Sequence, residues 1–197
     1  AIILAAGLST RFGSNKLLAR IGDKPMILRV LENALFARLS PIILVTGFEQ
    51  DRVLAAISQH IGNPRLLVTY NPDYPTGRAS SVREGLRAVP ASADSVMFLL
   101  GDQPFINGNF INRLLEFAEA HPTKSVIFPE CEGKKGNPII YRRSWFERLA
   151  SLEGDVTGYR LIQEYPEVVL RFPASDPSIF VSIETPEDYE RHSRDIA

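Results

Sequence analysis

Short apolar runs that are rich in β-branched residues recur along the chain, with polar segments between them. They lie at Ile2 to Ala5, Ile42 to Thr46, Leu66 to Tyr70, Ser95 to Leu100 and Ser125 to Phe128, and less regular runs follow at Pro138 to Tyr141, Val168 to Phe172 and Ile179 to Ile183. Runs of this length that are bounded by turn residues predict buried strands.

Apolar residues between several of these runs repeat at helical spacing. The stripes are Ile27, Val30, Leu31, Ala34 and Leu35; Val53, Leu54, Ile57 and Ile61; and Ile111, Leu114, Leu115 and Ala118, with a further helix expected around Trp145 to Leu149. Pro25 suits the first helical turn, and Thr185 with Asp188 predicts a capping box near the end of the chain. Strands that alternate with helices predict an α/β, three-layer sandwich with a mostly parallel sheet.

Composition adds limits to this picture. The 197 residues are 45% hydrophobic and 23% charged, so we expect one folded domain over 1–197 and no membrane partner. The net charge of -1 disfavours a nucleic-acid partner, and a single cysteine, Cys131, favours a cytoplasmic location. Because the chain begins with Ala1 rather than Met, we expect the natural protein to have further N-terminal residues.

The loop after the first predicted strand, in "LAAGLSTRFGSNK", holds two glycines and two cations. Gly7 and Gly13 let backbone N–H groups approach a polyphosphate, and Arg11 and Lys16 can neutralise its charge. The spacing matches neither the dinucleotide fingerprint nor the P-loop. From these residues alone, a phosphate site and an ordinary solvated turn are equally good interpretations.

A second candidate site follows the run that ends in "LLGDQPF". In an open parallel sheet the loops after the strands meet at one edge, so Asp102 is expected near the opening loop. Its carboxylate could hold Mg²⁺ against phosphates, although Gly101 and Pro104 also make an ordinary turn.

With both motifs in view, the sequence resembles the molybdopterin nucleotidyltransferase family, nearest to its molybdenum cofactor cytidylyltransferase branch. "LAAGLSTRFGSNK" is similar to the family's L-A-A-G-x-S-x-R-M-G-x-x-K, with Phe12 for Met, and "GDQP" to its metal motif. Weaker likenesses are "GNPIIY", "GDVTGYR" and "IETPEDY". The resemblance spans nearly the whole chain and implies a sheet of the nucleotide-diphospho-sugar transferase type.

The resemblance also implies an activity, which is the transfer of CMP from CTP to the phosphate of molybdopterin, with release of pyrophosphate and Mg²⁺ as cofactor. A molybdoenzyme client is a possible further partner. It implies catalytic roles for Arg11, Lys16 and Asp102. It implies nucleotide contacts for Leu4, Ala5, Ala6, Gly7, Ser9, Gly77, Ser80 and Ser81, acceptor contacts for Asn137, Pro138, Gly154 and Asp155, and metal ligation by Asp102 and Glu184.

Three positions depart from the family pattern. Asn137 stands where the family often has His, and Ser182 and Glu184 stand where it often has Asp, so the acceptor pocket and the second metal ligand are open. The guanylyl branch resembles L-A-G-G where this chain has Ala6. An added methyl there narrows the space beside the backbone, which favours a pyrimidine over a purine.

Two other functions compete with this one. "SSVREGL" is also similar to a stretch of the cytidylyltransferases that act on methylerythritol phosphate, although "LLGDQPF" departs from their aspartate motif. A protein of a different class, which binds a nucleotide and delivers a cofactor without catalysis, would also use these residues.

Overall fold

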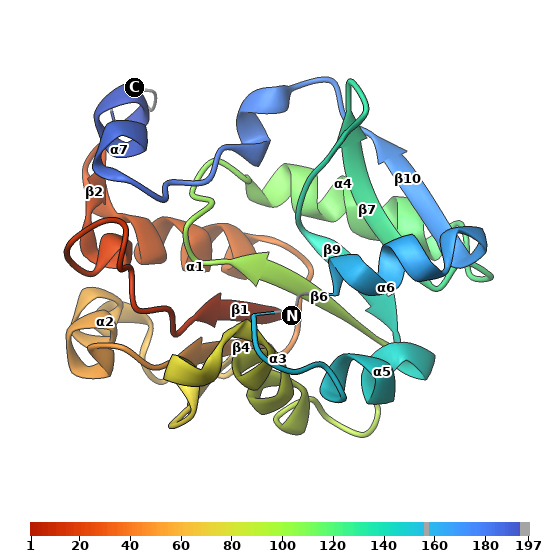
Figure 1. Ribbon diagram of the computed structural model, residues 1–197, viewed down its shortest axis with the longest axis horizontal. Coiled ribbons are helices and arrows are strands. Elements are labelled where there is room, and N and C mark those ends of the chain that lie inside the picture. The colour runs from red at the N-terminus through yellow and green to blue at the C-terminus, as the bar shows by residue number, and fades with distance from the viewer. Residues whose placement is uncertain (156–157, 194–197) are drawn as a thin grey trace.

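A mixed sheet forms the centre of the computed structural model, which describes residues 1–155 and 158–193, the side chains of 159–161 excepted (Figure 1). The strands are β1 (Ile2–Ala5), β4 (Ile42–Thr46), β5 (Leu66–Tyr70), β6 (Ser95–Leu100), β7 (Val126–Cys131), β8 (Lys134–Lys135), β9 (Ile139–Arg142) and β10 (Val169–Pro173). Their order is β10-β7-β9-β6-β1-β4-β5, with β8 beside β7. A separate ribbon pairs β2 (Arg20–Ile21) with β3 (Lys24–Pro25).

Most of the neighbouring strands run parallel. β1 pairs in parallel with β4 and β6, as β4 does with β5 and β10 with β7. β9 runs antiparallel to both β6 and β7. The predicted mostly parallel mixed sheet is therefore confirmed, and the carboxyl ends of β1, β4, β5 and β6 share one edge.

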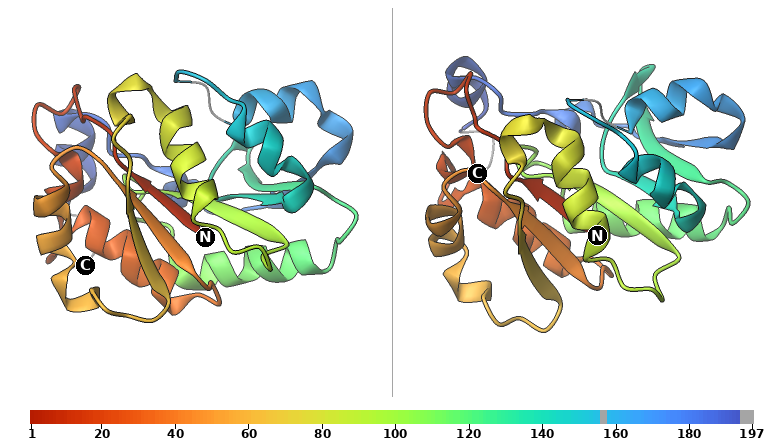
Figure 2. Two further views of the ribbon diagram at one scale, coloured as in Figure 1. Left: turned by 90° about the horizontal axis from the view of Figure 1, so that it is seen from below. Right: turned by 60° about the horizontal axis from the view of Figure 1, so that its bottom comes forward.

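Helices cover both faces of this sheet, as Figure 2 shows, which confirms the predicted three layers. The helices are α1 (Met26–Phe36), α2 (Gln50–Ala56), α3 (Arg78–Arg87), α4 (Gly108–Glu119), α5 (Phe146–Ala150), α6 (Tyr159–Glu164) and α7 (Pro186–His192). α1 and α4 pack on one face and α3 and α5 on the other, and each face has its own apolar cluster. Burial of these two clusters is the main force that holds the layers together. Within the described ranges, no helix has the length and apolar character to cross a membrane.

Three details of the sequence prediction are wrong. α2 ends at Ala56, and Ile61, placed on its apolar stripe, is 52% exposed. Pro25 lies at the N-cap of α1 instead of inside its first turn. No strand forms at Ile179 to Ile183, where Pro177–Phe180 is a 3₁₀ turn.

The missing strand has a physical reason. The segment is a mostly apolar run, which is typical of a strand, but its two buried residues, Ile179 and Ile183, join different apolar clusters. The Ile183 N–H donates to the carbonyl of Asp102 rather than to a neighbouring strand. The capping box at Thr185 and Asp188 is confirmed, with Asp188 Oδ2 accepting from the Thr185 N–H at 3.0 Å.

The placement of α3 against the sheet depends on Gly85. A Cβ built on Gly85 would lie 2.6 Å from Ile2 Cγ2, so the helix backbone rests directly on β1. We expect Gly85→Ala to lower the free energy of unfolding by about 1–3 kcal/mol, because the added methyl overpacks this contact. Chemical denaturation measures this loss. Arg87→Ala, on the exposed side of α3, is the control and should change stability by less than about 0.5 kcal/mol; an equal loss in both variants would contradict the close contact.

Candidate functional site

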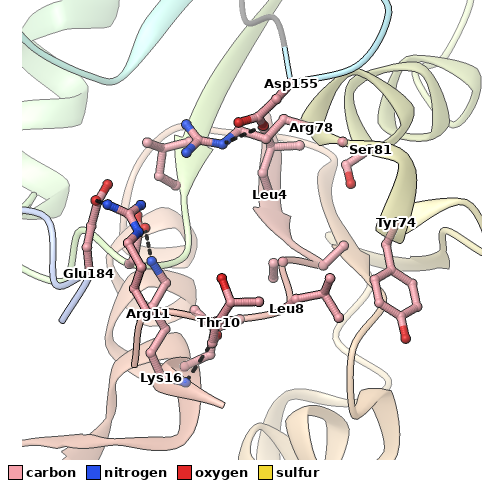
Figure 3. A pocket seen from close by; sticks show the side chains of 18 of the residues that line it. Leu4, Leu8, Thr10, Arg11, Lys16, Tyr74, Arg78, Ser81, Asp155 and Glu184 are labelled. Atoms are coloured by element: carbon pink, nitrogen blue, oxygen red, sulfur yellow. Dashed lines mark hydrogen bonds and ion pairs between the residues drawn. The ribbon is translucent and has the colours of Figure 1, made fainter. Parts of the chain in front are cut away.

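A pocket of about 400 Å³ lies at the carboxyl edge of the sheet, between the opening loop, the end of β6 and the start of α3 (Figure 3). It is open to solvent on one side. Most of the residues singled out from the sequence line it: Leu4, Ala5, Ala6, Gly7, Ser9, Arg11, Lys16, Gly77, Ser81, Asp102, Asp155 and Glu184. Four do not: Ser80, Asn137, Pro138 and Gly154.

The opening loop is held in a fixed shape by its own polar groups. Ser9 takes a left-handed conformation with φ 55°, and its hydroxyl accepts the Lys16 N–H at 3.3 Å. Asn15 is buried; it caps the 3₁₀ turn Lys16–Leu18 and donates to the carbonyl of Phe48 at 3.2 Å. The loop therefore presents Lys16 to the pocket from a rigid base.

Lys16 and Asp102 form an ion pair at the floor of the pocket. Lys16 Nζ lies 2.5 Å from Asp102 Oδ2, and both side chains are 16% exposed. The N–H of Gly101 donates to the carbonyl of Leu4, so the end of β6 is fixed against β1. The ion pair thus joins the opening loop to the segment that contains Asp102, the two motifs that were predicted to lie at the same edge of the sheet.

The other oxygen of the same carboxylate bears on metal binding. Asp102 Oδ1 is buried and has no hydrogen-bond partner among the residues that the structure describes. A buried acceptor without a partner is costly, and a hard cation such as Mg²⁺ would satisfy it. No cluster of three or more His, Cys, Asp or Glu side chains suited to a metal occurs in residues 1–155 and 158–193. The donor set fits a cation whose remaining ligands are substrate oxygens and water.

Arg11 and Glu184 form a second ion pair, at the wall of the pocket. Glu184, which was predicted as a metal ligand, is therefore paired with Arg11 in this structure. The next residue, Phe12, packs edge-on against Tyr189 of α7, with ring centroids 5.9 Å apart. Two contacts therefore tie the opening loop to the last helical segment.

A third ion pair, which sequence reasoning missed, links Arg78 to Asp155. Arg78 Nε lies 3.3 Å from Asp155 Oδ1, and the two side chains are 51% and 74% exposed. Arg78 is the first residue of α3, directly after Gly77, which was the available signal. Gly77 has φ 118°, and a Cβ there would run into the carbonyl group of Gly154. The Ala79 N–H donates to the Gly154 oxygen at 3.1 Å, so Gly154 supports the pocket from behind.

The two predicted serines have different surroundings. Ser80 is buried outside the pocket, and its hydroxyl lies 2.8 Å from the Gly77 carbonyl and 2.9 Å from the Asp73 carbonyl. Ser81 lines the pocket. Tyr74, also missed from the sequence, lines it on the same side. A Cβ on Gly47 would lie 2.8 Å from both Ala6 Cβ and Tyr74 Cγ, so the Ala6 methyl and the Tyr74 ring both lie close to Gly47, and Ala6 is only 2% exposed.

The remaining predicted acceptor residues, Asn137 and Pro138, do not line the pocket. Pro138 is buried and Asn137 is half-buried, directly before β9, whose Ile139 pairs with Phe98 of β6. Of the motif "GDVTGYR", Val156 and Thr157 lie outside the described residues.

The charges that line the pocket balance one another. Arg11, Lys16 and Arg78 are each paired with one carboxylate. Solvent-exposed pairs contribute only about 0–1 kcal/mol each, so an incoming polyphosphate can replace the carboxylates at Arg11 and Arg78 at little cost. This pocket can therefore bind a polyanion and a cation together.

Comparisons with known proteins show what the chain is similar to. A family model described as a MobA-like NTP transferase domain matches residues 1–168. The purine catabolism protein PucB of Bacillus subtilis is 30% identical, with 96% of this chain and 93% of that protein covered. The molybdenum cofactor cytidylyltransferase of Escherichia coli is 28% identical, with 95% and 92% covered.

Among solved structures, Rv0371c from Mycobacterium tuberculosis H37Rv has a TM-score of 0.84 at 25% identity, covering 96% of this chain and 94% of that one. A structure of Rv0371c in complex with manganese has a TM-score of 0.80 at 24% identity, covering 96% and 95%.

Proposed function

Since the chain belongs to the MobA-like NTP transferase family, we propose that it transfers CMP from CTP to the phosphate of molybdopterin and releases pyrophosphate. It is a nucleotidyltransferase of the MobA-like type; the nucleotide, the acceptor and the metal are the proposal. One observation carries the proposal. Arg11 and Lys16 of the glycine-containing loop line the same pocket as Asp102, whose buried Oδ1 has no hydrogen-bond partner among the described residues. The 28% identity to a molybdenum cofactor cytidylyltransferase supports the choice of substrates.

The reaction needs little from the protein beyond alignment and charge. An oxygen of the acceptor phosphate forms a bond to the α-phosphorus of CTP, and the bond from that phosphorus to the β-phosphate oxygen breaks. The acceptor oxygen is already anionic, so no general base is required. Negative charge grows on the departing pyrophosphate, and Arg11 and Lys16 neutralise it.

Metal binding in this proposal rests on Asp102, with Glu184 as the candidate second ligand. When bound, Mg²⁺ would neutralise phosphate oxygens and hold them in line. The free Oδ1 of Asp102 supports this role, as does the manganese complex of the related fold. Glu184 must leave Arg11 to take part, which the exposure of Arg11 (60%) allows.

The nucleotide and the acceptor would enter from different sides. The triphosphate belongs beside Arg11 and Lys16, and the base beside the backbone of Leu4 to Gly7. The acceptor belongs toward Asp155, Gly154 and the segment Asn137–Pro138. We also propose that residues 1–197 act as one domain, in the cytoplasm.

The decisive experiment is an acceptor screen. Purified protein, Mg²⁺ and either CTP or GTP are incubated with molybdopterin, with methylerythritol phosphate and without acceptor, and pyrophosphate and product mass are read. We expect pyrophosphate and the cytidylylated product with molybdopterin. Transfer to methylerythritol phosphate would redirect the assignment, and nucleotide binding without transfer to any acceptor would indicate a delivery protein.

Asp102→Asn should abolish metal-dependent turnover and leave the fold intact, because it removes a metal ligand at the edge of a strand and takes nothing from the core. The measurement is the initial rate over a Mg²⁺ titration, with circular dichroism as the test of folding. Asp23→Asn makes the same chemical change at an exposed ion pair far from the pocket and should keep the wild-type rate. An Asp102→Asn protein that stays active at limiting Mg²⁺ would refute the role of Asp102.

Arg11→Ala and Lys16→Ala should each lower kcat/KM by about 100-fold or more, since each removes a preorganised charge beside the leaving group. Steady-state kinetics with saturating acceptor provide the test. Arg38→Ala and Lys24→Ala are matched controls, because these cations form ion pairs away from the pocket. If all four variants behave alike, Arg11 and Lys16 are ordinary loop charges.

CTP should be used ahead of GTP, and Ala6→Gly should reduce that preference. The Ala6 methyl and the Tyr74 ring both lie close to Gly47, so removal of the methyl leaves space at this wall of the pocket and widens it for a purine. One methyl group is worth about 1–3 kcal/mol of discrimination. The ratio of kcat/KM for CTP and GTP is measured on both proteins. A wild-type preference for GTP would overturn the base assignment, and an unchanged ratio in the variant would exclude Ala6 as its cause.

A further inference from the structure

We propose that Asn71 is a positioning residue that makes the Ser81 hydroxyl a fixed hydrogen-bond donor, which reads an acceptor atom on the nucleotide base. This inference rests on the proposed function, because it assigns a nucleotide to the pocket. Nothing in the sequence motifs points to Asn71, which directly follows β5. Its side chain lies behind the wall of the pocket and is 2% exposed.

Hydrogen bonds fix the orientation of the Asn71 amide. Its Oδ1 accepts the Asp73 N–H at 3.0 Å, so the Nδ2 group must face the other way, toward α3. Nδ2 then donates one hydrogen to Ser80 Oγ at 2.8 Å and the other to Ser81 Oγ at 3.0 Å. The Asn71 N–H donates to the Thr46 carbonyl at 2.9 Å, which anchors the residue to β4.

The same contacts decide where the two serine protons go. Ser80 Oγ has carbonyl acceptors at Gly77 and Asp73, so its proton stays within the protein. Ser81 Oγ accepts from Asn71, and no acceptor for its own proton occurs among the residues that the structure describes. Ser81 is 7% exposed, and it lines the pocket. Its O–H is therefore available to a ligand in the pocket, as a donor.

The position of Ser81 selects the part of the nucleotide that it meets. Figure 3 shows Arg11, Lys16 and Glu184 on one side of the pocket and Ser81 and Tyr74 on the other. If the triphosphate lies beside the two cations, the base lies toward Ser81. Cytosine presents two acceptors, O2 and N3, on the edge that a donor can read. A site built to hydrogen-bond its ligand discriminates more strongly than an apolar one, because its buried donor is otherwise left unpaired.

The test measures binding by calorimetry on the full chain in the presence of Mg²⁺, with two probes: CTP, and ribose 5-triphosphate, which lacks the base. Ser81→Ala should weaken CTP binding about tenfold, the ratio expected for one lost hydrogen bond, and leave ribose 5-triphosphate binding unchanged. Thr69→Val is the matched control. It removes another hydroxyl that joins β5 to α3, through Glu84 at 2.6 Å, at a residue outside the pocket lining, and should bind both probes like the wild type.

Asn71→Asp separates positioning from a merely structural role. An ionised carboxylate cannot donate, so it draws the Ser81 proton away from the pocket and turns a lone pair toward the base. At about pH 8.5 this variant should bind CTP at least as weakly as Ser81→Ala. Adding Ser81→Ala to Asn71→Asp should cause no further loss, because the two changes act through one hydroxyl.

Each result decides the matter. Wild-type CTP affinity in Ser81→Ala, equal losses for CTP and ribose 5-triphosphate, or additive losses in the double variant would overturn the inference. The acceptor screen on the wild type judges the proposed function separately, since CTP binding needs no acceptor. A wild type that binds CTP but transfers nothing would refute the proposed function. The inference about Asn71 and Ser81 would still be tested by CTP binding to the variants. A wild type that binds neither probe would overturn both.

Discussion

The ion pair between Lys16 and Asp102 is the contact on which the pocket depends, because it joins the opening loop to the end of β6 through two residues that are 86 positions apart in sequence. Both side chains are mostly buried, and removing two charges from water costs about as much as their attraction returns. The pair therefore adds little to stability, and breaking one half of it leaves an unpaired charge. Its effect is geometric, since it holds one carboxylate oxygen and leaves the other free.

A difference in exposure separates this pair from the other two. Arg11 with Glu184 and Arg78 with Asp155 lie at the rim, where water screens them and exchange of partners is inexpensive. The floor of the pocket is thus fixed while its rim can adapt, which suits a site where a polyanion must enter and pyrophosphate must leave. Gly77 adds to this arrangement, because its missing side chain lets Gly154 sit against the start of α3.

The sequence predicted the sheet well because buried parallel strands appear as continuous apolar runs, and β1, β4 and β6 form where those runs lie. β5 also forms at its predicted place, but it is an edge strand and is mostly exposed rather than buried. It also predicted that the opening loop and Asp102 would share an edge, since topology alone requires it. It failed at Ile179 to Ile183, where an apolar run contributes one buried residue to each of two separate clusters and forms no strand. No local pattern distinguishes these two cases.

Where the sequence could not predict the direction of a site side chain, tertiary packing determines it. Ser80 and Ser81 are adjacent and chemically identical, and only the rotation of α3 about its axis decides which one faces the pocket. Gly85 lies one turn after Ser81 on the same face of α3, and its close contact with Ile2 fixes that rotation. Asn71 lies behind Ser81, and the hydrogen bond from the Asp73 N–H to Asn71 Oδ1 sets the direction of its side-chain amide. A motif can therefore name the serine pair, but the packing of α3 on β1 decides which hydroxyl reaches a substrate.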